Sequence, residues 1–442
     1  MIPLKFYYNN ILTFLEIQGI LMKLKSEEYK KFGFLSAILS LIVGIYWLLR
    51  PIKDALFTNM VDTFFLPYAK IVSAVVLIPI ILLYSKLVDL FEKKQQLFYV
   101  ITPLYGLFFL VIAFLLNNRY VGFDNLKWHK DQILGWLVYL GVESFILVIY
   151  SLFWSFVSSI TSTSSAKKGY HLIVAGAQIG AIIGSEFTKH APQLGIPILI
   201  FIAACGMFII PILVMLFIKL HYHTINSSQL KKTTGFIEGL KLLISRPYLL
   251  GILGIATLGS MVSTTLEFAL ILKAKETYQS TTKIVESLGF YGQSINFLTL
   301  IFALFFTKII IKKCGLNISL RICPIVVGVL TICVWVLPSL RMLFFVTVII
   351  KCVLYGLNNP CKEMAYIQTS DNIKFKTKGW IDTIGYRLAE SIGGMIFLTI
   401  SNLTFFGSSL FIMLCVILLW IICTIYVGRK HFELMQNNQT IE

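Results

Sequence analysis

Long stretches of apolar residues, separated by short clusters of polar and charged ones, constrain this chain more than any other feature of its sequence. The stretch 98–116, for example, contains no charged residue, and about twenty such residues in a helix cover the hydrocarbon thickness of a bilayer. Of the 442 residues, 57% are hydrophobic and 13% are charged, against roughly 45–50% and 25% in soluble domains. The sequence therefore predicts an integral membrane protein.

The apolar runs, divided at turn and charge clusters, predict about twelve transmembrane helices. The longest polar connection inside the chain, 221–246, divides them into six and six. The predicted fold is therefore all-α, with two six-helix bundles as in major-facilitator-type transporters. The predicted spans are 32–57, 67–83, 98–116, 133–156, 172–187, 196–218, 248–272, 288–306, 322–337, 343–368, 381–400 and 410–427.

This division predicts a chain of five parts. The N-terminal segment lacks the apolar region and cleavage site of a signal peptide, so we expect it to be retained as a cytoplasmic or interfacial segment. Lysines concentrate in the connections that follow even-numbered spans, so the positive-inside rule predicts that both termini are cytoplasmic. The parts are the N-terminal segment (1–31), the N-terminal bundle (32–220), a central cytoplasmic loop (221–246), the C-terminal bundle (247–428) and a cytoplasmic tail (429–442).

Composition and motifs exclude several classes of function. The net charge of +17 fits either the positive-inside rule or the steering of an anionic substrate. The basic residues are dispersed between apolar spans, so we expect no nucleic-acid partner. The eight cysteines and six histidines lack the spacing of a zinc site, so we expect no metal or cofactor. Neither a G-x-x-x-x-G-K-[ST] loop nor a hydrolase motif occurs, so the sequence predicts no enzyme.

Four charged residues stand out inside the predicted spans. A charge within a span costs roughly 2.5–3.5 kcal/mol on insertion scales, so it marks a transport pathway or a paired site. Lys53, Glu143, Glu267 and Lys362 lie in spans one, four, seven and ten. These are symmetry-equivalent helices that line the cavity in a major-facilitator bundle, so the four residues are candidates for the substrate site.

Each candidate also has a purely structural interpretation. Lys53 follows a proline near a span end and could extend its ammonium to the membrane interface. Glu143 could be a protonated or paired packing residue, and Glu267 could pair with Lys273 or Lys275. The sequence leaves these alternatives open.

The fifth span carries a stripe of small residues. Gly176, Gly180 and Gly184 recur every four residues, which favours close packing against another helix. Gln178 is a polar amide amid this stripe, and a buried amide could recognise the donors and acceptors of a nucleobase.

Three segments resemble one known family. The segment 359–367, Asn-Pro-Cys-Lys-Glu-Met-Ala-Tyr-Ile, is followed by a lysine-rich stretch, 374–378, and by Ile381-Asp382. This pattern resembles the P-C-K-E-M-A-Y-I region of the bacterial and plastid nucleotide transporter family, the ATP/ADP translocases of obligate intracellular bacteria. The segment 49–54, Leu-Arg-Pro-Ile-Lys-Asp, is similar to the family's L-R-D-T-K-D, and Leu-Phe-Trp-Ser-Phe at 152–156 is similar to its L-F-W-G-F.

The resemblance implies twelve helices and nucleotide antiport, and it places the family's important charged residues on Lys53, Glu143, Glu267 and Lys362. Two departures from the family pattern remove positive charge. Glu390 stands where a lysine is expected, and Ile271 where a lysine is common. The nucleotide therefore stays open, because family members carry ATP and ADP, other nucleotides with protons, or NAD.

We therefore predict an ATP/ADP antiporter that works by alternating access, as a monomer, in a bacterial inner membrane. Its partners would be the lipid bilayer and a nucleotide. Whether phosphate or a proton is transported as well stays open. Alternatives are a proton-coupled importer of other nucleotides, an NAD carrier, and a drug or lipid exporter.

The predicted antiporter assigns a role to each site residue. Lys53 and Lys362 would bind phosphates as compact cationic donors, and Glu143 and Glu267 would hold these lysines in the empty carrier. Arg387 would add a phosphate contact, and Gln178 a contact to the base.

Overall fold

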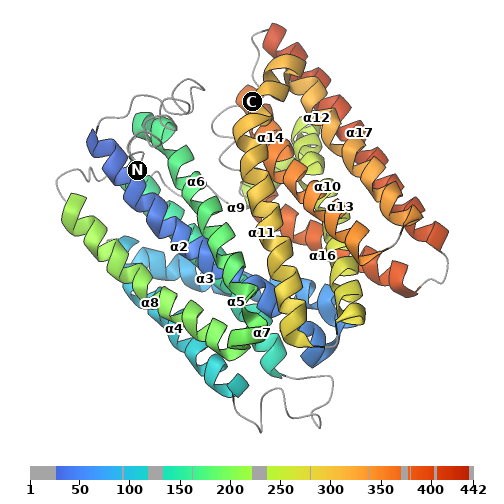
Figure 1. The fold of residues 1–442 in the computed structure, drawn as a ribbon. Coiled ribbons are helices and arrows are strands. Elements are labelled where there is room, and N and C mark those ends of the chain that lie inside the picture. The colour runs from blue at the N-terminus through green and yellow to red at the C-terminus, as the bar shows by residue number, and fades with distance from the viewer. Residues whose placement is uncertain are drawn as a thin grey trace, which may run out of the picture.

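The computed structural model describes residues 26–91, 94–117, 133–161, 163–221, 236–278, 280–337, 339–369, 377–378, 380–402 and 406–437. Nearly all of these residues are helical, which confirms the predicted all-α membrane architecture (Figure 1). The first six long helices are α2 (Ser26–Phe57), α3 (Leu66–Leu90), α4 (Lys94–Asn117), α5 (Ile133–Ile160), α6 (Thr163–Thr188) and α8 (Ile196–His221).

The second half of the chain repeats this pattern of long helices. It contains α10 (Pro247–Thr277), α11 (Thr281–Phe305), α12 (Thr307–Val336), α13 (Leu340–Val353) with its continuation α14 (Asn359–Ala365), α16 (Tyr386–Asn402) and α17 (Phe406–Gln436). Two short helices, α7 (Ala191–Leu194) and α9 (Phe236–Ser245), lie between the long ones.

Nine helical stretches among the described residues are long and apolar enough to cross a membrane. One of them, Glu28–Ile80, contains both α2 and the start of α3. Two further predicted spans coincide with shorter helices, the apolar stretch Leu172–Thr188 of α6 and the helix α16. Every predicted span thus coincides with a helix, so the protein is a multi-pass membrane protein.

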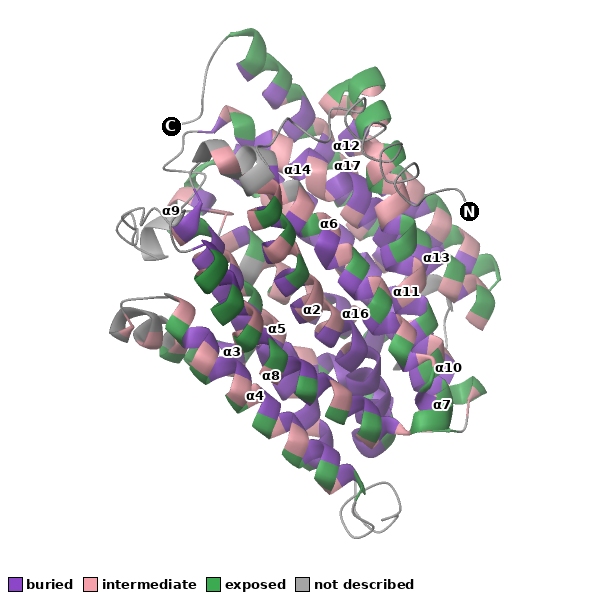
Figure 2. Ribbon diagram, turned by 60° about the vertical axis from the view of Figure 1, so that its left-hand side comes forward, coloured by how far each residue is buried: buried purple, intermediate pink, exposed green. Residues whose placement is uncertain are grey.

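The outer faces of the helices are apolar where they meet lipid. On α4, Leu104, Leu107, Val111 and Phe114 are 53–72% exposed, and their spacing of three and four residues places them on one helix face. Figure 2 shows that exposed residues follow the outer side of α4 while buried ones face its neighbours. The exposed apolar face is therefore the lipid-facing surface, since water would not favour it.

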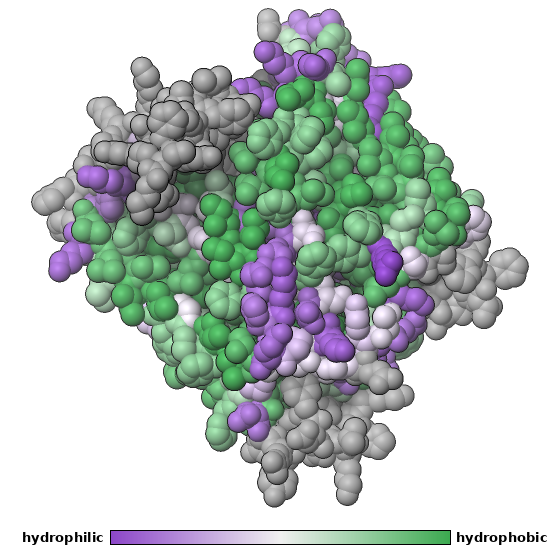
Figure 3. All heavy atoms as spheres, viewed as in Figure 1, coloured by the Kyte–Doolittle hydropathy of each residue, from purple (hydrophilic) through white to green (hydrophobic). Residues whose placement is uncertain are grey.

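The helices form two packed groups. One core cluster of buried residues comes mainly from α2 to α8, and a second comes mainly from α10 to α17. Figure 1 shows the two groups side by side, diverging toward the end at which α2 begins and α17 finishes. In the space-filling view, apolar residues cover much of both groups, and hydrophilic residues gather low in the centre (Figure 3).

The glycine stripe of α6 packs against α2, as the structural interpretation predicts. A Cβ atom at Gly180 would lie 1.9 Å from the carbonyl oxygen of Ser40, and one at Gly184 would lie 2.0 Å from that of Gly44. The absence of side chains lets the two backbones approach closely. The two helices therefore form a rigid pair inside the first bundle.

The helix that carries the family-like segment is interrupted. Between α13 and α14, residues Leu354–Asn358 form a π-helical turn, directly before Pro360. Proline lacks an N–H and its ring clashes with the preceding turn, which opens the regular hydrogen-bond ladder. The side-chain amide of Asn358 donates to the carbonyl oxygen of Ile255 in α10 at 3.1 Å, which ties the interruption to a neighbouring helix.

The two bundles touch at one end, which we call the closed end. It is the end at which α2 finishes and α11 begins. There the amide of Asn59 donates to the hydroxyl of Thr281 at 2.7 Å, and Lys275 donates to the carbonyl oxygen of Thr58 at 2.8 Å. A Cβ at Gly289 would collide with Thr188 at 1.7 Å, so α6 and α11 are also in close contact.

Some predicted part boundaries differ from the helices. The loop predicted at 221–246 contains α9, and His221 is the buried last residue of α8. The tail predicted at 429–442 is helical as far as Gln436, because α17 continues past the predicted membrane boundary. Most of the N-terminal segment, 1–25, lies outside the described residues.

Candidate functional site

The site begins with a buried ion pair in the first bundle. The ammonium of Lys53 on α2 donates to the carboxylate of Glu143 on α5 at 2.6 Å, and both side chains are only 2% exposed. Lys53 also lies 3.2 Å from the carboxylate of Asp54 and 4.3 Å from the ring centroid of Tyr139. Lys53 is therefore a buried, paired cation, and its ammonium does not reach the membrane interface.

The carboxylate of Glu143 also binds two cations besides Lys53. Lys70 on α3 lies 3.1 Å away, and Arg387 on α16 donates to the second carboxylate oxygen. Arg387 and Lys70 both contact Glu390 on α16, at 3.7 Å and 3.2 Å. Because α16 belongs to the second bundle, the Arg387–Glu143 and Lys70–Glu390 pairs join the two bundles.

A second group of charges surrounds Glu267 on α10. Arg50 on α2 donates to one of its carboxylate oxygens at 2.5 Å, across the interface between the bundles. Lys351 on α13, 3% exposed, lies 3.0 Å from the other oxygen. Lys273 and Lys275, the partners of Glu267 in its purely structural interpretation, instead pair with Glu276 and with Asp62.

The two groups are neighbours. Arg50 and Asp54 share one face of α2, and both line a small cavity together with Glu267 and Tyr291. Arg50 also lies 4.8 Å from the ring centroid of Trp47. We call the whole set the central charge cluster; it consists of Arg50, Lys53, Asp54, Lys70, Glu143, Glu267, Lys351, Arg387 and Glu390.

The cluster is nearly charge-balanced, with five cations against four carboxylates. Buried charges are tolerated only when they are paired, because each costs several kcal/mol to desolvate. An arrangement of this kind can bind an anion if the anion replaces carboxylates as the partner of the cations. It can also hold the bundles together when no anion is present.

Lys362 lies outside the central charge cluster. Its ammonium donates to Asp382 at 2.5 Å, and it lies 3.8 Å from Glu363, which also accepts from Lys378 at 2.6 Å. Lys362 is further along the same span than Lys351, away from the closed end. In this conformation, therefore, Glu267 holds Arg50 and Lys351 and does not hold Lys362.

Gln178 lies on a different side of α6 from the glycine stripe. Its side chain is half-buried, and its carbonyl oxygen is buried without a hydrogen-bond partner among the described residues. No ion pair or hydrogen bond of the described residues connects it to the central charge cluster.

The structure thus brings Lys53, Glu143 and Arg387 together and places Glu267 beside them. Sequence reasoning did not assign Arg50, Asp54, Lys70, Lys351 or Glu390 to the site. Each is a charge inside a predicted span, so the same criterion of an in-span charge could have found it. Lys351, for example, precedes Lys362 in the same span.

Solved structures define the class of fold. The chain is similar over 93% of its length to the POT family transporter PepTSo, with a TM-score of 0.61, 13% identity and 99% of that chain covered. It is also similar over 92% of its length to the nucleoside transporter NupG, with a TM-score of 0.61, 11% identity and 98% of that chain covered. The fold is therefore that of a major-facilitator-like membrane transporter.

The family follows from the sequence as a whole. Residues 10–431 match the model of the TLC ATP/ADP transporter family, so the chain belongs to that family. It is similar to ADP,ATP carrier protein 3 of Rickettsia bellii, with 23% identity over 96% of this chain and 99% of the relative. It is also similar to ADP,ATP carrier protein 1 of Rickettsia prowazekii, with 24% identity over 96% of this chain and 98% of the relative.

Proposed function

We propose that this protein exchanges ATP for ADP across a bacterial inner membrane by alternating access, with both termini in the cytoplasm. Membership of the TLC ATP/ADP transporter family supports the nucleotide substrate. The observation that carries the mechanism is the buried central charge cluster, in which ion pairs join the two bundles.

In this proposal the phosphates of the nucleotide take over the cations of the cluster. Arg50, Lys53, Lys70, Lys351 and Arg387 are each held by a carboxylate within 3.2 Å. A nucleotide that enters between the bundles offers phosphate oxygens to the same donors, and charge-assisted hydrogen bonds of this type are the strong ones. Glu143 and Glu267 then lose their partners, which frees the bundles to move relative to each other.

Lys362 is assigned to an earlier contact with the nucleotide. Its helix α14 lies toward the end where the bundles diverge, and among the described residues it pairs with Asp382 and Glu363. We assign it to the capture of phosphate as the nucleotide approaches the cluster. Gln178, whose buried carbonyl oxygen accepts no hydrogen bond from the residues that the structure describes, is assigned to the base.

In this proposal the cross-bundle pairs make transport an exchange. An empty carrier that reoriented would have to separate Arg387 from Glu143, Lys70 from Glu390, and Arg50 from Glu267. Breaking one buried pair costs roughly 3–5 kcal/mol because it leaves uncompensated charge. A bound nucleotide lowers this cost, so the carrier returns only when it carries another nucleotide.

A proton-coupled nucleotide importer is a second candidate, and Glu390 favours it. This carboxylate stands in the cluster between Lys70 and Arg387, at a position where the family pattern has a lysine. A carboxylate in that place could accept a proton when the nucleotide takes its cations.

Purified protein in liposomes separates the candidates. The liposomes contain ADP, ATP, GTP, CTP, NAD or no nucleotide, and the uptake of labelled ATP is measured with and without a pH gradient. The exchange proposal expects uptake only with a nucleotide inside. Equal uptake into empty liposomes driven by an inward proton gradient would favour the second candidate instead.

A further inference from the structure

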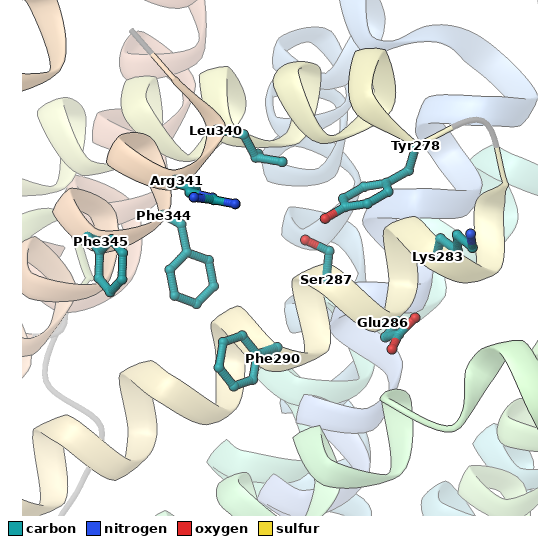
Figure 4. A pocket seen from close by; sticks show the side chains of 9 residues that line it. All are labelled: Tyr278, Lys283, Glu286, Ser287, Phe290, Leu340, Arg341, Phe344 and Phe345. Carbon is teal, nitrogen blue, oxygen red and sulfur yellow. The ribbon is translucent and has the colours of Figure 1, made fainter. Parts of the chain in front are cut away.

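A pocket of about 620 Å³ lies at the closed end of the second bundle, away from the central charge cluster. Figure 4 shows its lining side chains on two sides, one group from the start of α13 and the other from the start of α11. Tyr278 comes from the connection that precedes α11. The side chains that line the pocket are Tyr278, Lys283, Glu286, Ser287, Phe290, Leu340, Arg341, Phe344 and Phe345.

Two exposed cations and one carboxylate line this pocket. Among the residues that the structure describes, neither Lys283 nor Arg341 takes part in an ion pair, and Glu286 has none either. Arg341 also lines an adjoining hollow together with Phe345 and Ser339. The pocket therefore carries unneutralised positive charge, which favours an anionic occupant.

The pocket lies where two helical stretches long and apolar enough to cross a membrane begin, Thr281–Phe305 and Leu340–Gln368. Lys283 and Arg341 stand in the first turn of α11 and of α13. The next turns expose large apolar side chains, with Phe290 at 50% and Phe345 at 61%. A cation followed by aromatic rings along a helix is typical of the boundary between lipid headgroups and acyl chains.

We propose that this pocket binds an anionic phospholipid from the adjacent leaflet, and that the bound lipid stabilises contact between the bundles at the closed end. Arg341 holds the phosphate of the headgroup, Lys283 adds positive charge on the other side of the pocket, and the acyl chains lie on the exposed rings of Phe290 and Phe345. Free phosphate would gain nothing from the aromatic surface, whereas a phospholipid matches both the charge and the apolar wall.

The link to the closed end passes through Phe290. Its ring stacks on that of Phe344, with centroids 5.3 Å apart and planes inclined by 12°. The ammonium of Lys189, from the first bundle, lies 5.4 Å from the centroid of Phe290. Lys189 pairs with Glu186 at 2.8 Å, and Glu186 accepts a hydrogen bond from Gln293 of α11. A lipid that fixes Phe290 therefore stabilises a cross-bundle contact.

Lipid retention tests the binding, and it does not depend on nucleotide transport. Detergent-purified protein is mixed with phosphatidylglycerol or phosphatidylcholine, and the retained lipid is counted by native mass spectrometry. We expect preferential retention of phosphatidylglycerol, about fivefold lower in Arg341→Gln or Lys283→Gln and largely preserved in Arg341→Lys. Lys273→Gln is the matched control, because Lys273 is an exposed lysine near the same end that pairs with Glu276 outside the pocket.

Equal retention of the two lipids, or unchanged retention in Arg341→Gln, would overturn the binding proposal. Displacement of the lipid by inorganic phosphate at matched concentration would also overturn it, because the site would then be a phosphate site. For the closed end, cysteines at positions 59 and 281 are cross-linked in vesicles of each lipid. More cross-linking in phosphatidylglycerol is expected, and equal cross-linking in the two lipids would contradict the stabilisation.

Discussion

The ammonium of Lys53 lies 2.6 Å from the carboxylate of Glu143, although the two residues are 90 positions apart in the chain. A related pair joins Lys351 to Glu267 at 3.0 Å in the second bundle. In the first bundle the cation is on α2 and the acid on α5, whereas in the second the acid is on α10 and the cation on α13. The corresponding helices of the two halves thus carry the same kind of pair with the charges exchanged.

Replacing Glu143 removes the common partner of three cations. Glu143→Gln should therefore lower the thermal stability of the empty carrier, because loss of one partner from a buried pair costs roughly 3–5 kcal/mol. Saturating ATP should restore part of that stability, since its phosphates supply the missing charge and ligand binding stabilises the folded state. Melting in detergent, with and without ATP, measures both effects.

Glu276→Gln is the control for this variant, because Glu276 is 51% exposed and, within the part of the chain that the structure describes, its ion pair is with the exposed Lys273. Its melting temperature should remain that of the parent. If Glu143→Gln melts like the parent and ATP stabilises both equally, Glu143 is a packing residue.

Lys351 is predicted to bind phosphate in the second bundle. Lys351→Gln should weaken nucleotide binding by roughly 1.5–3 kcal/mol, the range for a hydrogen bond to a charged group, or about ten- to a hundredfold. Lys351→Arg should recover only part of the loss, because a planar guanidinium fits a site shaped for an ammonium poorly. Lys430→Gln is the control, because Lys430 is an exposed lysine, and it should bind nucleotide like the parent. An unchanged nucleotide affinity in Lys351→Gln would exclude the contact assigned to Lys351.

Lys362 should contact the nucleotide before the nucleotide reaches the central charge cluster. We expect Lys362→Gln to slow nucleotide association more than dissociation, because a cation on the approach path steers the substrate. Asp382→Asn frees the same ammonium from its partner and should speed association. Rapid-mixing measurements of both rates decide this, and an effect of Lys362→Gln on dissociation alone would place the residue in the final site.

The glycine stripe of α6 predicts a loss of stability without a change in the site. Gly180→Ala should destabilise the protein by roughly 1–3 kcal/mol, as overpacking does, because its Cβ would lie 1.9 Å from the carbonyl oxygen of Ser40. Gly33→Ala is the control, since nothing lies within 4 Å of a Cβ there. Equal melting temperatures for the two variants would rule out the tight α2–α6 contact.

The sequence could predict the fold because membrane insertion makes each span visible as an apolar run. The ion pairs inside the site are harder to predict from the sequence. Position inside a span indicates Lys53, Glu143 and Glu267 as site residues. The sequence predicts that Glu143 and Glu267 hold Lys53 and Lys362, with pairing of Glu267 to its sequence neighbours Lys273 or Lys275 as the structural alternative. The actual partners, Arg50 and Lys351, come from other helices, and helix packing decides such pairs. The helix that carries Lys362 is interrupted by the π-helical turn before Pro360. The spacing of apolar residues in the sequence does not predict such a turn.

The orientation in the membrane is tested by labelling in intact cells, after the exposed Cys205 and Cys415 have been replaced. A cysteine at position 273, near the closed end, should react with an impermeant reagent from outside. One at position 430 should react only after the cells are opened, because the positive-inside rule places the termini in the cytoplasm. The reverse pattern would invert the proposed topology.

Counter-exchange in liposomes tests the central claim most directly. Labelled ATP is supplied outside, and the interior holds either ADP or buffer alone. The cross-bundle ion pairs predict rapid uptake with internal ADP and almost none without it, because the empty carrier must separate buried charges to return. Uptake of labelled ATP into nucleotide-free liposomes at the same rate would contradict obligatory exchange through the central charge cluster.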